Sequence, residues 1–467
     1  MFVAVGCGQY PNVHRRAEVQ PNLAGAVSPA TQPSRTEGAG PSGSNGTIAS
    51  PSPPAPSRET SRSSPGWTPP VGAPTSGQTE SQVPPDKATS GEQSGDERNT
   101  GSSKIWGPTV VIGIHAPLSG SGPVHLFSLR AEKELYWRFG RDLRPVDIAG
   151  RHVRVVLRDD RNDRANALRA CREMARKDHA FLLVGMSSPE PIDACARFAQ
   201  RAGLPYLSLG GAERHLAGLG NYFALSESYA QQTPPIVSYL RRTYTHDCTQ
   251  VLMVAPRVST FDDAVSAFRR TCPGGQVERV PASVGAETVG SHLCVGPART
   301  DRVVYPLVDP QFFLRMARAA RSCAPPYVGV GVTMGLDGVA YAFCRQGGHS
   351  QELRFLSPAP AFADALRFDS GFERAAETAV VPPDDVGWLL WGMSRSVGAL
   401  LEQVGSQLSR HSFIQKASTA SVSVEGFARL QFSSANHFGG RAFSLLTNVC
   451  SGGTGHYVTL RANVSGF

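Results

Sequence analysis

Beyond a long polar N-terminal stretch, short apolar runs alternate with amphipathic stretches along the chain. The run Val110–Ile114 ends at a turn rich in glycine, which predicts a buried strand. A helix is expected over Leu126–Phe139 and a second strand over Val153–Leu157. Asn162 or Asp163 can cap the helix that follows. The same alternation continues through Phe181–Val184, Pro191–Ala202, Tyr206–Leu209, Thr233–Tyr244, Val251–Val254, Asp262–Thr271, Arg302–Tyr305 and Gln311–Ser322.

This alternation predicts an α/β fold. Strands separated by single helices run parallel, and right-handed crossovers place helices on both faces of the sheet. The strands are too many for one comfortable sheet, so we expect two lobes. Ligands of such sheets bind beyond the carboxyl ends of the strands. That rule nominates the loops Ala116–Gly122, Gly185–Pro189, Gly210–Glu213, Ala255–Phe261, Pro306–Pro310 and Gly329–Gly335.

The N-terminal stretch has a different composition from the rest of the 467 residues. Fifteen of the 36 prolines precede residue 105, and the only aromatic residues there are Phe2, Tyr10 and Trp67. Such a segment buries too little apolar surface to offset its ordering entropy. We expect residues 8–105 to be a disordered tether rich in proline, serine and glycine, with the globular part after it.

The formal net charge of +8 at pH 7 does not point to nucleic acid. The excess of basic residues is spread thinly, without a basic stripe or interleaved aromatic residues, so no nucleic-acid partner is expected. No run of 18 or more apolar residues occurs, which excludes a spanning helix within the sequence as written.

Eight of the nine cysteines fall in the globular part. An even number of widely spaced cysteines, without paired CxxC motifs, favours disulfides in an oxidising compartment over a zinc site. Neighbouring helices and strand-helix units suggest one pairing, although spacing alone does not fix the connectivity. The suggested pairs are Cys171 with Cys195, Cys248 with Cys272, Cys294 with Cys323, and Cys344 with Cys450.

The ninth cysteine, Cys7, follows a short apolar run at the start of the sequence. Residues 1–7 resemble the end of a bacterial lipoprotein signal, in which Cys7 becomes the lipidated N-terminus. Ala4 stands where leucine is usual, and the charged start of such a signal is missing, so we expect a start codon further upstream. The alternative is an ordinary disordered N-terminus.

The order of several local signatures resembles that of a known family. They are IGIHAPLSGSG from residue 112, VRVVLRDDRNDRANALRACREM from 153, FLLVGMSSPEPIDACARFAQRAGLPYLSLGGAE from 181, YFALSESYAQQ from 222 and DRVVYPLVDPQFFLRMARAAR from 301. Together they resemble type I periplasmic solute-binding proteins, in particular the leucine/isoleucine/valine-binding group that serves ABC importers. The resemblance covers roughly residues 108–465.

The resemblance implies two Rossmann-like lobes joined by a three-segment hinge. Lobe 1 would comprise residues 106–232 plus 355–425, and lobe 2 residues 233–354 plus 426–467. A small-molecule solute would bind in the cleft, where closure of the lobes removes it from water, and the closed form would dock on an ABC permease. The protein would then be extracytoplasmic and anchored by lipid to the outer face of the cytoplasmic membrane.

Four positions that would hold an amino acid headgroup in the family have other residues here. The family's serine aligns with Pro189, its alanine and threonine pair with Gly210 and Ala212, its arginine with Ala224, and its acidic residue falls near Gly331. Unpaired burial of both zwitterion charges is unfavourable. We therefore expect another solute, for which small residues at 210–212 leave room. Candidate contacts are His125, Phe127, Ser187, Ser188, Gly210, Gly211, Tyr229, Phe261, Asp309 and Thr333.

Other chemistries have weaker support in the sequence. Asp159, Asp160 and Asp163 resemble a metal or phosphoryl site, but helix capping explains Asp163. The glycine clusters do not form a dinucleotide motif, the histidines lack zinc spacing, and no serine lies in a GxSxG elbow. We expect no catalytic residue, metal or cofactor. A ligand sensor or protein-interaction module with the same fold is the alternative function, and an enzyme ranks third.

Overall fold

The computed structural model describes residues 105–464, except for 120–125, 127, 210–213, 296–301, 332–334, 349–350 and 441. Nearly all of the predicted tether, and Cys7 with it, lies outside the described residues. Within them, the chain builds two large mixed sheets and one small two-stranded sheet.

The first large sheet has the order β2-β3-β1-β4-β5-β6. Its strands run parallel except for β2, which pairs antiparallel with β3. The central strands β1 and β4 are almost entirely buried, as their continuous apolar runs predict. The strands are β1 (Thr109–Ala116), β2 (Asp147–Ile148), β3 (Arg151–Asp159), β4 (Leu182–Gly185), β5 (Tyr206–Ser208) and β6 (Tyr222–Ala224).

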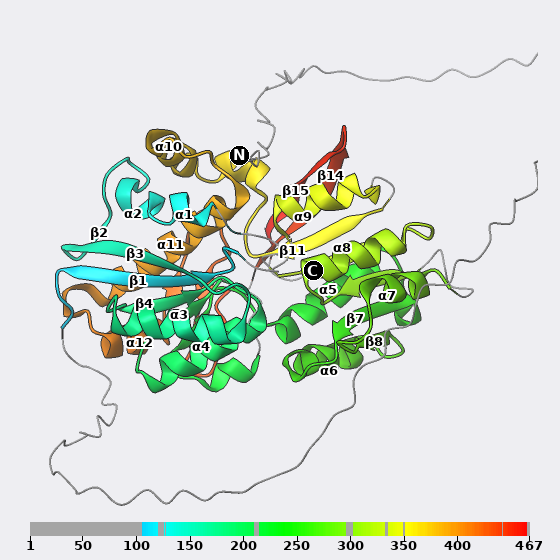
Figure 1. Ribbon diagram of the computed structural model, residues 1–467, viewed down its shortest axis with the longest axis horizontal. Helices are drawn as coiled ribbons and strands as arrows, with labels where there is room; N and C mark the ends of the chain where they lie inside the picture. Colours follow the sequence, from blue (N-terminus) through cyan, green and yellow to red (C-terminus); the bar gives the residue numbers. More distant parts are fainter. Residues whose placement is uncertain are drawn as a thin grey trace, which may run out of the picture. The chain divides into compact units, whose positions relative to one another are not determined.

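Helices cover both faces of this sheet. Figure 1 shows α3 and α4 along one side of the strands and α11 and α12 behind them. The helix expected over 126–139 is split into α1 and α2. The helices of this lobe are α1 (Leu129–Glu132), α2 (Leu135–Phe139), α3 (Arg164–Arg176), α4 (Pro189–Arg201), α10 (Ser370–Ala379), α11 (Asp385–Val404) and α12 (Arg410–Ala417).

The second large sheet has the order β15-β14-β11-β10-β9-β7-β8. The antiparallel hairpin of β14 and β15 closes one edge. The remaining strands run parallel. The strands are β7 (Val251–Pro256), β8 (Gln276–Val280), β9 (Val303–Pro306), β10 (Tyr327–Val330), β11 (Leu353–Ser357), β14 (Phe443–Ser451) and β15 (Thr454–Val464).

Two helix layers also enclose the second sheet. One layer, formed by α5 and α6, packs on one face, while α7, α8 and α9 pack on the other. The α5 helix begins with a capping box between Ser228 and Gln231. The helices are α5 (Tyr229–Thr243), α6 (Asp262–Thr271), α7 (Ala286–Leu293), α8 (Pro310–Ala319) and α9 (Asp337–Arg345). The fold is therefore the expected pair of Rossmann-like lobes.

The chain passes between the two large sheets three times. It leaves the first sheet after β6, returns after β11, and enters the second sheet again at β14. The exact lobe boundaries stay a prediction. The crossing predicted at residue 355 falls inside β11. The segment 426–440 packs against the first lobe through Leu430 and Phe432, with β12 (Ser421–Val422) paired to β13 (Leu430–Gln431).

Four disulfides cross-link the described part of the chain, with the suggested pairing. Cys171–Cys195 joins α3 to α4 in the first lobe. In the second lobe, three more bonds join Cys248 to Cys272, Cys294 to Cys323, and Cys344 to Cys450. Packing of neighbouring elements brings the cysteines within bonding distance, helix against helix for Cys171–Cys195 and α9 against β14 for Cys344–Cys450.

Candidate functional site

A cavity of about 450 Å³ lies between the carboxyl edges of the two large sheets. The first lobe contributes Pro117, the segment 185–190 and Leu209, while the second contributes Pro256, Val258, Thr260, Phe261 and the segment 307–310. These are the strand-end loops that the topology rule nominates, because the carboxyl ends of parallel strands meet at one edge. Most of the lining is apolar, as is usual for a small-molecule site.

Five of the predicted contact residues line this cavity. Ser187, Ser188, Tyr229, Phe261 and Asp309 come from four different loops or helix starts and from both lobes. The other five predicted contacts, His125, Phe127, Gly210, Gly211 and Thr333, lie outside the described residues. That the five lining residues bind a solute stays a proposal.

On the first lobe, Asn162 holds the loop that carries the two serines. Its Oδ1 accepts hydrogen bonds from Ser187 Oγ and from the Ser188 backbone N–H, both at 3.3 Å. Asn162 itself has a positive φ of 55°, a conformation that asparagine tolerates better than most residues. Its backbone N–H donates to Asp160 Oδ1 at 2.9 Å. One side chain thus links two strand-end loops of the wall.

A buried polar network lies next to this loop. His115 Nδ1 donates to Asp160 Oδ2 at 2.7 Å, and the Tyr206 hydroxyl donates to His115 Nε2 at 2.7 Å. These roles follow because a carboxylate only accepts. Burial raises the pKa of Tyr206 well above its usual value, so its hydroxyl keeps the proton that it donates. Gly185 has no side chain, and a Cβ there would collide with the Tyr206 hydroxyl.

The neighbouring Asp159 fixes the start of the loop after β1. Its carboxylate accepts hydrogen bonds from the Leu118 N–H at 2.9 Å, from the Ser119 N–H at 3.2 Å and from the Ser119 hydroxyl. Burial raises the pKa of Asp159, but these bonds and one from Arg161 outweigh it and lower the pKa overall. Asp163 caps α3 by accepting from Asn166 N–H at 2.8 Å. The acidic run is therefore structural, as expected for Asp163.

Two helices begin at the cavity, one in each lobe. Ser188 is the N-cap of α4, yet its side chain makes no capping hydrogen bond. Asp309 is the N-cap of α8 and accepts from the Phe312 N–H at 2.9 Å. Prolines follow both caps, at 189 and 310. Because proline has no backbone N–H, the first turn of each helix has fewer free N–H donors than a first turn without proline.

The second lobe presents two aromatic rings to the cavity. The centroids of Tyr229 and Phe261 lie 5.7 Å apart, with their planes inclined by 32°. Gly331, the position assigned to the family's acidic residue, has a φ of 99°, and a Cβ there would lie 3.3 Å from the Tyr229 hydroxyl oxygen. Near the place where the resemblance puts the family's acidic residue, the structure therefore has a glycine beside a tyrosine.

Several apolar residues of the lining were not among the predicted contacts. Val386 and Leu389 reach the cavity from the first turns of α11, and Leu336 reaches it from the residue before α9. The sequence of α11 is apolar on most of its faces, so its periodicity does not show which side lines a cavity. Met186 was part of a nominated loop but was not singled out.

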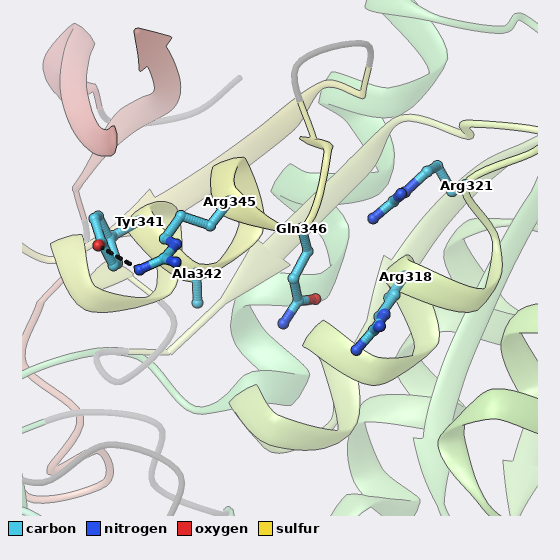
Figure 2. Close-up of a pocket in the computed structure, with 6 residues that line it drawn as sticks. All are labelled: Arg318, Arg321, Tyr341, Ala342, Arg345 and Gln346. Carbon is cyan, nitrogen blue, oxygen red and sulfur yellow. Dashed lines mark hydrogen bonds between the residues drawn. The ribbon is translucent and has the colours of Figure 1, made fainter. Parts of the chain in front are cut away.

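A second cavity, of about 430 Å³, lies on the second lobe alone. Figure 2 shows Arg318 and Arg321 on one side of it and Arg345, hydrogen-bonded to Tyr341 at 3.0 Å, on the other. Arg318 and Arg345 belong to the last turns of α8 and α9, where basic side chains offset the negative ends of the helices. Arg318 and Arg345 therefore have a structural role at the ends of their helices. The cavity between the lobes remains the candidate site.

Within the described ranges, one group of three side chains has the spacing of a metal site: His115, Cys171 and Cys195. The two cysteines form a disulfide, and His115 bonds to Asp160 and Tyr206, so these groups are not available as ligands. His437 Nδ1 donates a hydrogen bond to the Tyr222 carbonyl oxygen of β6, at 3.0 Å, because a carbonyl oxygen can only accept. This bond holds the segment of His437 against β6.

A family model described as periplasmic binding protein matches residues 109–453. The chain therefore belongs to the periplasmic binding protein family, whose members are solute-binding proteins, and its fold is that of type I members. A search of the curated proteins found no significant match. None of the helices in the described part of the chain is both long and apolar enough to cross a membrane.

Solved structures with the same fold include ABC transporter proteins with different solutes. A solute-binding protein from Rhodopseudomonas palustris BisB5, in complex with 3,4-dihydroxybenzoic acid, has 14% identity and a TM-score of 0.60 over 77% of this chain and 99% of that chain. LivJ from Streptococcus pneumoniae, in complex with isoleucine, has 16% identity and a TM-score of 0.59 over 76% and 99%. LivK from Thermotoga maritima, a leucine-binding protein, has 15% identity and a TM-score of 0.57 over 74% and 97%.

Proposed function

We propose that this chain is an extracytoplasmic solute-binding protein that captures a small molecule between its lobes for an ABC importer. The observation that carries the proposal is the cavity of about 450 Å³, lined from both lobes at the carboxyl edges of their sheets. A solute held by both walls favours the closed arrangement of the lobes, and the closed form is the state that a permease can distinguish.

The solute is not a branched-chain amino acid in this proposal. Pro189 and Ala224 replace a hydroxyl and a guanidinium of the family's headgroup clamp, and Gly331 lacks the acidic side chain. LivJ and LivK are described with isoleucine and leucine, whereas other structures of the same fold contain benzoate derivatives. The fold thus accommodates several solute classes, and the lining residues decide among them.

The proposal includes attachment of the protein to the cell envelope. Cys7 would carry the lipid, and residues 8–105 would tether the globular part to the outer face of the cytoplasmic membrane. A flexible chain of this length has a root-mean-square reach of roughly 50 Å. Metabolic labelling with a fatty acid, compared between the native sequence and Cys7→Ser in a host that processes lipoproteins, tests the anchor. Equal labelling of the two proteins would contradict it.

A thermal-shift screen of the folded protein against a metabolite library tests the central proposal. A ligand that binds only the folded form raises the melting temperature. The matched control is Val258→Trp, because Val258 lines the cavity yet is 39% exposed, so a larger side chain fills the cavity without overpacking a core. We expect hits other than leucine that shift the native protein and not V258W. A leucine response, or hits that shift both proteins equally, would contradict the proposal.

A further inference from the structure

The charge of the cavity lining differs from what an anionic solute requires. Among the residues that the structure describes, the lining contains no arginine, lysine or histidine, and its only carboxylates are Glu190 and Asp309. Arg161 and Arg257 are adjacent in sequence to lining residues but are not part of the lining. Among the described lining residues, a carboxylate meets two like charges and no cationic side chain.

The two helix starts at the cavity do not compensate for this charge. A helix N-terminus binds anions through its free N–H groups and its positive dipole end. In the first turn of α4, Pro189 and Pro191 have no N–H, and Glu190 adds a negative charge. In the first turn of α8, Pro310 has no N–H, and the Phe312 N–H is bonded to Asp309. Both helix ends are therefore poor anion sites.

The same features suit an amine. Glu190 belongs to the first lobe and Asp309 to the second, so a cation between them interacts favourably with both walls. The faces of Tyr229 and Phe261 also attract cations, and the remaining lining accepts an apolar body. Glu190, in the first turn of α4, and Asp309, the N-cap of α8, are both exposed, so an amine between them keeps part of its hydration.

We infer that the cavity selects an organic cation, an amine on an apolar or aromatic body, and disfavours a carboxylate. This inference rests on the proposed function and names the solute class for that site. It separates the chain from the structures of the same fold that contain benzoates or isoleucine.

Three probes with one body and different terminal groups test the inference: 2-phenylethylamine, 2-phenylethanol and phenylacetate. Calorimetric titration of the full chain should give the highest affinity for the amine and the lowest for phenylacetate, about tenfold or more apart. Glu190→Gln and Asp309→Asn should each weaken amine binding about two- to fivefold, since exposed charges contribute modestly. D309N keeps the helix cap, because asparagine caps as well as aspartate.

Glu377→Gln is the matched control, because Glu377 is an exposed residue of α10 outside the lining. It should bind all three probes as the native protein does. Phenylacetate binding as tightly as the amine, absence of amine binding, or equal effects of E190Q and E377Q would each overturn the inference. A library hit that contains a carboxylate and fails to shift V258W would overturn the solute class while leaving the proposed function intact.

Discussion

The two walls of the cavity are stabilised in different ways. The first-lobe wall depends on a buried polar network, in which Asp160 joins His115 to the loop of Asn162. The second-lobe wall consists mainly of aromatic and aliphatic side chains, with Thr260 and Asp309 among them, on a sheet whose lobe contains three of the four disulfides. A wall that presents hydroxyl groups needs hydrogen bonds to orient its loop, whereas a largely apolar wall needs a shape that fits the solute and a rigid support.

The largest loss of stability should follow from opening the longest cross-link of the second lobe. Cys344–Cys450 closes a loop with a sequence separation of 106, against 24 for Cys171–Cys195 in the first lobe. Loop entropy predicts a loss of about 5 kcal/mol for C344S/C450S and about 3.5 kcal/mol for C171S/C195S. Urea unfolding of both double variants measures the difference. A larger loss for the first-lobe pair would show that the cross-links do not support the second wall preferentially.

Asp160→Ala should destabilise the first lobe by about 3 kcal/mol, because it leaves His115 buried without its acceptor. It should also abolish binding of any library hit, since the Asn162 N–H loses its partner and the serine loop is no longer held. The measurement is urea unfolding together with titration of the hit. Asp163→Asn is the control, which keeps its cap and should lose less than about 1 kcal/mol. Equal stability of D160A and D163N would contradict the network's role.

Glu132 should make the stability of the first lobe depend on pH. It lies under the first turn of α11, where its carboxyl occupies the space that a side chain at Gly387 would take. Burial, and secondarily the charge of Asp384, raises the pKa of Glu132 from 4.5 to about 9. The folded chain therefore binds a proton that the unfolded chain releases above about pH 4.5, so stability falls as the pH rises from 4.5 to 9.

Glu132→Gln should remove most of this slope and stabilise the protein at pH 8 by about 2 kcal/mol. Burial also raises the pKa of Asp337, to about 6, and raises the pKa of Asp385 well above its usual value, so a weaker slope of the same sign should remain in E132Q. Melting temperatures of the native protein, E132Q and E377Q between pH 5 and 9 provide the comparison. If E132Q retained the full slope, or E377Q lost it, the assignment to Glu132 would be wrong.

The smallest effect is expected for the loop that carries Ser187 and Ser188. Asn162→Gly keeps the left-handed backbone but removes the acceptor for Ser187 and Ser188. It should weaken ligand binding three- to tenfold, and the free energy of unfolding should change by less than about 1 kcal/mol. Asn162→Asp keeps an acceptor oxygen and should bind the hit at least as well. Titration of both variants with one library hit tests this prediction, and equal binding by N162G and the native protein would contradict it.

Much of the fold could be predicted from local patterns. The buried runs of β1 and β4 are continuous and apolar, and the carboxyl-edge rule placed Ser187, Phe261 and Asp309 near one cavity. The suggested cysteine pairs are those of the structure, although spacing alone did not fix the connectivity. Val386 and Leu389 could not be assigned to the cavity, because a helix buried on most sides gives no periodic signal for the face that lines a cleft.

The sequence also predicted only part of the role of Asn162. Its position after a strand suggested a helix cap, but Asp163 takes that role, and the side chain of Asn162 instead reaches a loop 25 residues later. The choice depends on the left-handed backbone at Asn162, which no local pattern in the sequence specifies. The split of the expected helix into α1 and α2 likewise has no signal in the apolar spacing.

The most direct test of the central claim is calorimetric titration of the native chain and V258W with the strongest library hit at two temperatures. If the solute binds between the lobes, we expect one solute per chain, a negative heat-capacity change from burial in an apolar cavity, and no binding by V258W. Binding that survives V258W unchanged, or that lacks a one-to-one stoichiometry, would contradict capture of the solute between the lobes.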